Sequence, residues 1–123
     1  MMKPPKRRER QRSGIERAPQ REWPRHRKHI RTLECSVPGC ELQRFAVIEC
    51  AHVRHGTDGG TAIKPADWWT LPLCAVHHRQ QHEIGEPAFE ARYKLNMKAL
   101  ALALARRSPD KAMIEAMKQA GVT

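Results

Sequence analysis

The stretch LPLCAVHHRQQH, residues 71–82, decides the fold of this chain. Its beginning continues an apolar run that contains Trp68 and Trp69, and we expect a strand over 68–73 in which one ring packs inside and the other faces out. Residues 73–83 are predicted to form a short helix, which Gly85 ends. The outer ring offers a stacking surface for a base, although packing in the core or an interface is the commoner use of tryptophan.

Four potential metal ligands lie on that helix as two pairs. Cys74 and His77 form one pair, while His78 and His82, at i and i+4, project together from a face turned away from the first. One helix can therefore serve a structural ion and a second ion. The alternative for the second pair is two solvated surface histidines. A zinc-protease site is excluded, because Arg79 stands where that chemistry needs a glutamate.

The other half of a structural site lies at Cys35 and Cys40, which the turn at Pro38-Gly39 brings together. With no secretion signal in view, we expect reduced thiols, so a metal explains the cysteines better than disulfides do. Cys50 competes for a ligand place, but it lies in an apolar run that predicts a strand over 47–53, which favours a core position. The predicted structural zinc ligands, a Cys3His set, are Cys35, Cys40, Cys74 and His77.

Composition indicates one small, strongly basic domain. The chain has 123 residues and a formal net charge of +10. Residues 1–31 hold twelve Lys and Arg against three Glu, and we expect a mostly disordered basic arm there that contacts nucleic acid through residues such as Arg7 and Arg8. A solubilising tail is the alternative. No apolar run is long enough to span a bilayer, so we expect no membrane contact and a cytoplasmic location.

The C-terminal part predicts two helices. Apolar residues recur at spacings of three and four from Phe89 to Leu104, which predicts one amphipathic helix over 87–107. Ser108 as N-cap and Pro109 at the first helical position predict the start of a final helix, which Gly121 closes. These helices pack on the core of a monomer, or their remaining apolar surface forms a homodimer contact.

A second ion with two protein ligands keeps coordination positions open, as catalysis requires. It also needs a base. His52 lies at the end of the strand predicted over 47–53, before His55 and a flexible loop, and a neutral imidazole can take a proton from water near pH 7. The alternatives are a ligand role for His52 and a plain loop position for His55.

Taken together, these residues resemble the HNH, or ββα-metal, nuclease superfamily, and most of all its small phage and prophage members similar to the YbcO-like and RecA-dependent Ref nucleases. The resemblance covers residues 35 to about 93. It implies an α+β fold with a small zinc-stapled ββα-metal core over 32–86 and a helical extension over 87–123 that packs on it. The matching pieces are AHVR at 51–54, Gly59-Gly60, KPAD at 64–67, LPLCAVHH at 71–78, and His82.

The resemblance also implies roles for single residues. His52 would be the general base, oriented by Asp67 where the superfamily usually has an Asn, and His78 and His82 would hold a catalytic ion: Mg2+, Mn2+ or Zn2+. The expected function is that of a metal-dependent DNA endonuclease that hydrolyses phosphodiester bonds. The alternatives are a non-catalytic zinc-binding nucleic-acid module and a recombination accessory protein that acts through a protein partner. The residues expected to clamp the phosphate backbone are Arg54 and Lys64.

Overall fold

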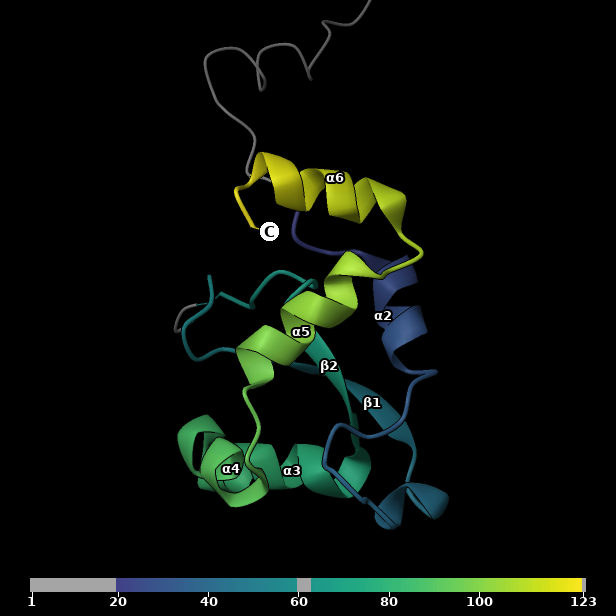
Figure 1. Ribbon diagram of the computed structural model, residues 1–123, viewed down its shortest axis with the longest axis vertical. Helices are drawn as coiled ribbons and strands as arrows, with labels where there is room; N and C mark the ends of the chain where they lie inside the picture. Colours follow the sequence, from purple (N-terminus) through teal and green to yellow (C-terminus); the bar gives the residue numbers. More distant parts are fainter. Residues whose placement is uncertain (1–19, 60–62, 123) are drawn as a thin grey trace, which may run out of the picture.

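The computed structural model describes residues 20–59 and 63–122 of the chain (Figure 1). Arg7, Arg8 and Gly60, which carried sequence predictions, lie outside these residues. The described part is a small α+β domain with two antiparallel strands and five helices. None of its helices is long and apolar enough to cross a membrane. The elements in chain order are α2 (Pro24–Ile30), the 3-10 turn η1 (Leu42–Arg44), β1 (Ile48–His52), β2 (Thr70–Cys74), α3 (Ala75–Ile84), α4 (Glu86–Tyr93), α5 (Met97–Arg106) and α6 (Lys111–Gln119).

The two strands form a hairpin whose register pairs Ile48 with Cys74 and His52 with Thr70. Every residue of β2 is buried, whereas Ala51 is the buried residue of β1. A two-stranded sheet is marginal alone in water, so its stability depends on the elements that cover it. The strand predicted over 47–53 and the helix predicted over 73–83 are confirmed within a residue or two, and Gly85 ends that helix with φ of 86°.

Helices from both ends of the chain cover this hairpin. Figure 1 shows α5 crossing β2, α2 beside the strands, and α6 at the end of the molecule opposite α3 and α4. The largest buried apolar side chains come from different elements, and burying each contributes roughly 1.5 to 3 kcal/mol. They are Ile30 of α2, Leu71 and Leu73 of β2, Phe89 of α4, Met97 of α5 and Met113 of α6.

The structure differs from the sequence expectation at the N-terminus. Residues 24–30, which we assigned to a disordered arm, form α2 and pack into the core. Pro24 lies in the first turn, where its missing N–H breaks no helical hydrogen bond. Trp23, His26 and Ile30, at spacings of three and four, are buried. The stripe was missed because only one of its members is aliphatic and basic residues surround it.

The expectation that one tryptophan ring faces out is wrong, whereas core packing, the commoner use of tryptophan, is confirmed for both rings. Trp68 and Trp69 lie in a turn before β2, and both are buried, with 5% and 7% of their surface exposed. Lys98 of α5 places its Nζ 5.5 Å from the centre of the Trp69 ring, which adds a cation–π contact. Neither ring is therefore free to stack on a base.

The helix predicted over 87–107 is two helices. Lys94 adopts a left-handed conformation with φ of 55° and ends α4, and Asn96 starts α5 by accepting a hydrogen bond from the Ala99 N–H at 3.0 Å. The N-cap of α6 is Asp110 rather than Ser108, because its carboxylate accepts from the Met113 N–H. The sequence did not reveal the break between α4 and α5, because the apolar residues keep their spacing of three and four across the short turn between the two helices.

His26 joins α2 to the turn between α5 and α6. Its Nδ1 lies 2.8 Å from the Ser108 hydroxyl, and its side chain is fully buried. Burial and the neighbouring His29 lower the pKa of His26 to about 4, against the opposing charges of Asp67 and Asp110. The folded chain therefore holds this imidazole neutral.

We expect acid to destabilise the fold through His26. Below pH 6.5, the ordinary pKa of histidine, the unfolded chain binds a proton at His26, whereas the folded chain does not bind this proton until about pH 4. The free energy of unfolding therefore falls as the pH is lowered from 6.5 to about 4. The free energy of unfolding should drop by about 1 kcal/mol per pH unit. Urea unfolding at about pH 7 and about pH 5 measures it. The drop should be smaller in His26→Gln, and equal drops in both proteins would contradict the assignment.

Candidate metal centre and adjoining pocket

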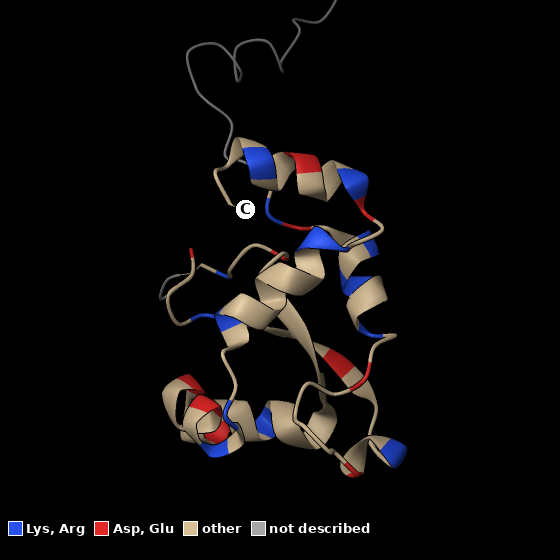
Figure 2. Cartoon of the chain, viewed as in Figure 1, with Lys and Arg blue, Asp and Glu red and all other residues tan. Residues whose placement is uncertain are grey.

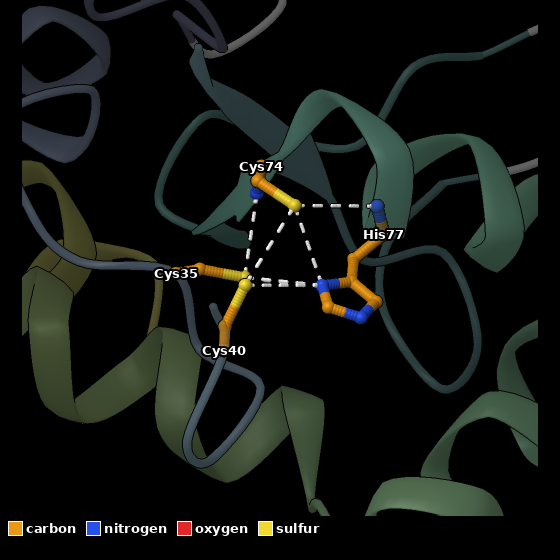
Figure 3. Close-up of side chains that lie close together, drawn as sticks. All are labelled: Cys35, Cys40, Cys74 and His77. Carbon is orange, nitrogen blue, oxygen red and sulfur yellow. Dashed lines mark hydrogen bonds between the residues drawn. The ribbon is translucent and has the colours of Figure 1, made fainter. Parts of the chain in front are cut away.

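Four buried side chains converge where β2 meets α3 (Figure 3). They are the predicted set Cys35, Cys40, Cys74 and His77, and their ligand atoms all lie within 4.8 Å of one another. His77 Nδ1 lies 3.3 Å from the Cys74 sulfur, 3.5 Å from that of Cys40 and 3.6 Å from that of Cys35. All four cysteines of the chain are free rather than disulfide-bonded. The group could hold a structural metal ion.

Local structure explains why these atoms meet. Cys74 is both the last residue of β2 and the N-cap of α3, and its sulfur accepts a hydrogen bond from the His77 N–H. Gly39, with φ of 68°, turns the chain between Cys35 and Cys40. The Cys35 sulfur in turn accepts from the Cys74 N–H at 3.4 Å. The turn and the helix start are thereby joined even before a metal is considered.

Burial disfavours ionised thiols here, and it raises the pKa of Cys35 to about 11. A bound cation reverses this preference, because metal ligation requires the thiolate. On the helix side, Tyr93 of α4 packs edge-on against the His77 ring with centres 5.2 Å apart, and its hydroxyl donates to Gln80. The imidazole is thus held in place by packing as well as by its own helix.

A separate pocket of about 480 Å³ opens between α2, β1, the following loop and α3. It brings together three histidines, one carboxylate, one thiol and four cations. Every described residue for which the sequence suggested a role at a second ion or a phosphate is here, except Asp67, which lies behind His52. The residues that line it are Arg27, Arg31, Glu49, Cys50, His52, Arg54, Lys64, His78 and His82.

Asp67 contacts His52 directly. His52 Nε2 lies 2.9 Å from one carboxylate oxygen, and the other accepts hydrogen bonds from the Trp23 N–H at 2.6 Å and from Arg27 at 2.5 Å. Burial alone raises the pKa of Asp67, but the hydrogen bonds from His52 and Trp23 and the charge of Arg27 outweigh it and hold the pKa below its usual value. A charged Asp67 keeps the His52 proton on Nε2, which leaves Nδ1 with a lone pair.

Glu49, His78 and His82 form a second chain of contacts. His78 Nδ1 lies 2.8 Å from the Glu49 carboxylate, and His78 Nε2 lies 3.3 Å from His82 Nε2. A carboxylate at one ring nitrogen favours the tautomer that leaves the other nitrogen free, an arrangement common around metal ligands. Two nitrogens bound to one tetrahedral ion at 2.0 to 2.1 Å lie about 3.3 to 3.4 Å apart. The pair therefore has the spacing of metal ligands.

Sequence reasoning missed Glu49. It precedes His52 by three residues on a strand, and no ligand spacing within β1 marks it out. The hairpin register pairs Glu49 with Leu73, next to the start of α3, and this brings its carboxylate to His78. Cys50 lies outside the Cys3His group, as its place in the strand predicted, but the expected core position is wrong, because Cys50 is half-buried and lines the pocket.

Hydrogen bonds and an ion pair hold the loop after β1 near its start and near its end. The Glu86 carboxylate accepts hydrogen bonds from the backbone N–H groups of Arg54 and His55, at 2.9 and 2.8 Å. Arg21 forms an ion pair with Asp58 at 3.3 Å and donates to the Lys64 carbonyl at 2.9 Å. These contacts hold the backbone of Arg54 and of Lys64 at the pocket.

Comparisons with protein-family models, with curated proteins and with solved structures found no match. The resemblance to the HNH superfamily stays a prediction from sequence motifs.

We expect Cys40→Ser to remove the bound metal and unfold the domain. A structural metal site contributes on the order of 10 kcal/mol, which is comparable with the whole stability of a small domain. Metal content by mass spectrometry and thermal melting by circular dichroism measure both effects. Cys50→Ser is the matched control and should keep the metal. A Cys40→Ser protein with native metal content and melting temperature would refute the ligand assignment.

Proposed function

We propose that this chain is a metal-dependent DNA endonuclease of the HNH type. The observation that carries the proposal is a single pocket in which His52, held by a buried carboxylate, lies with the His78 and His82 pair among four cationic side chains. The order β1, β2, α3, with the base on the first strand and the ion ligands on the helix, supports an HNH-like ββα core.

We assign zinc to the Cys3His group. Three thiolates and one imidazole are a common donor set of structural zinc, which binds sulfur at 2.3 Å and nitrogen at 2.0 to 2.1 Å. Tetrahedral geometry then places neighbouring ligand atoms about 3.5 to 3.8 Å apart. The distances from His77 Nδ1 to the three sulfurs, 3.3 to 3.6 Å, and the 3.9 Å between the Cys40 and Cys74 sulfurs fit this ion.

His78 and His82 would hold the catalytic ion, and Mg2+, Mn2+ and Zn2+ are the candidates. When bound, such an ion supplies a Lewis acid that stabilises negative charge on the scissile phosphate and the leaving oxygen. Glu49 orients the His78 ring and keeps its proton on Nδ1. With only two protein nitrogens the site keeps room for water and for a substrate oxygen.

His52 supplies the base. Its Nδ1 takes the proton of a water molecule as the water oxygen attacks phosphorus and the bond from phosphorus to the leaving oxygen breaks. Asp67 stabilises the imidazolium that forms, and the leaving oxygen takes a proton from solvent. Burial of Asp67 behind the ring makes this orientation rigid. The cationic side chains of Arg54 and Lys64 at the pocket attract the phosphate backbone. The net charge of +10 favours a polyanionic substrate, and the sequence motifs favour DNA.

We expect nicking of supercoiled plasmid in the presence of Mg2+ or Mn2+. Removal of the base or of an ion ligand should slow it by about 100-fold or more, so His52→Ala and His78→Ala lose cutting. His55→Ala is the matched control, because His55 is exposed on the loop that follows β1 and does not line the pocket. A zinc-loaded, folded protein that binds plasmid but never cuts it would instead indicate a non-catalytic binding module.

We expect Glu49→Ala to weaken the catalytic ion site while the fold stays intact. Loss of a carboxylate that orients a ligating histidine costs about 10- to 100-fold in metal affinity or activity. The Mn2+ concentration for half-maximal nicking should therefore rise, and excess Mn2+ should restore part of the rate. Glu41→Ala, an exposed glutamate away from the pocket, is the control. An unchanged Mn2+ requirement would remove Glu49 from the site.

A further inference from the structure

Helix α2 has a buried face and a basic face. Trp23 and Ile30 lie in the core, while Arg25, Lys28 and Arg31 are exposed and follow one another at intervals of three residues. Side chains at this spacing are neighbours on a helix surface, so the three cations form a ridge along α2. Figure 2 shows the blue Lys and Arg segments that recur along this helix.

The ridge is not neutralised within the described residues. The ion pairs in this region belong to other cations, since Arg27 pairs with Asp67 and Glu22, and Arg21 pairs with Asp58. None of the described carboxylates makes an ion pair with a member of the ridge, although Glu22 and Glu34 lie near its two ends in the chain. The ridge therefore presents positive charge to solvent.

The ridge is continuous with the pocket. Arg31 is a member of the ridge and also lines the pocket that holds His52 and His78, and Arg27, which supports Asp67, lines it too. From Arg25 to Arg31 the helix rises by about 9 Å, which is longer than one phosphate group. A partner that covers the whole ridge and also reaches the pocket needs negative charges repeated along this length, as the phosphates of a nucleic-acid backbone supply.

We propose that the exposed face of α2 binds the nucleic-acid backbone next to the cleaved bond, so that the strand leaves the pocket along Arg31, Lys28 and Arg25. This inference rests on the proposed nuclease function and adds the path of the substrate. Contacts to phosphate carry no base information, so α2 contributes affinity and position rather than sequence preference. An acidic protein segment is the competing partner. The ridge is continuous with the pocket for which we propose phosphodiester hydrolysis, and this favours nucleic acid.

The double variant Arg25→Gln/Lys28→Gln tests the path. Binding of the zinc-loaded full-length protein to a fluorescein-labelled DNA duplex is measured by anisotropy over a range of salt, without added Mg2+ or Mn2+, so that no cutting intervenes. The dissociation constant at low salt should rise about tenfold, and the slope of log affinity against log salt should fall by about 2, one for each lost phosphate contact. Metal content and melting temperature should stay native.

The matched control is Lys111→Gln/Lys118→Gln, which removes the same charge from exposed positions on α6. Its salt slope should stay near that of the unmodified protein. Equal loss of affinity in both double variants would overturn the proposal, because general charge would then explain binding. Preferential binding of a labelled poly-glutamate peptide, with the same dependence on α2, would also overturn it.

Failure of this inference differs from failure of the nuclease function. If the unmodified protein nicks plasmid but the α2 variant binds DNA with an unchanged salt slope, α2 is not on the path and the nuclease proposal stands. If the unmodified protein never nicks plasmid but the α2 variant loses affinity and salt slope as expected, α2 binds DNA and the hydrolytic assignment fails.

Discussion

The convergence of three thiols and one imidazole at the junction of β2 and α3 is the constraint on which the rest of the structure depends. Cys74 ends the strand and caps the helix, so the direction of α3 relative to the hairpin is set at this one residue. A two-stranded sheet and a ten-residue helix are both marginal alone. By joining them to the turn at 35–40, the cluster also sets the direction in which the His78 and His82 face of α3 points.

A buried carboxylate links the N-terminal helix to the candidate site. Asp67 is fully buried, and its charge is tolerated because His52, Arg27 and the Trp23 amide all donate to it. Two of these donors come from the segment that leads into and forms α2. One face of the helix therefore supports Asp67 behind His52, and another face presents exposed cationic side chains to solvent.

Local pattern was enough for some elements and misleading for others. The Cys3His ligands and the helix stop at Gly85 follow from spacing and from the need for positive φ, which are properties of a few neighbouring residues. The break at Lys94 and the N-cap at Asp110 did not follow, because two short helices with a turn between them can keep the apolar spacing of one. Helix α2 was hidden because its buried residues, Trp23, His26 and Ile30, include only one aliphatic side chain and lie among basic residues.

The sequence by itself determined which reactive side chains this chain brings together: a Cys3His group that could hold a metal, a histidine pair one helical turn apart, and a histidine at the end of a strand. Tertiary structure alone decided which groups support them. Glu49 reaches His78 through the register of the hairpin. Asp67 and Arg27, which are 40 residues apart in the chain, meet behind His52. Spacing along the chain reports neighbours on one element, whereas partners from different elements meet only when packing places those elements against each other.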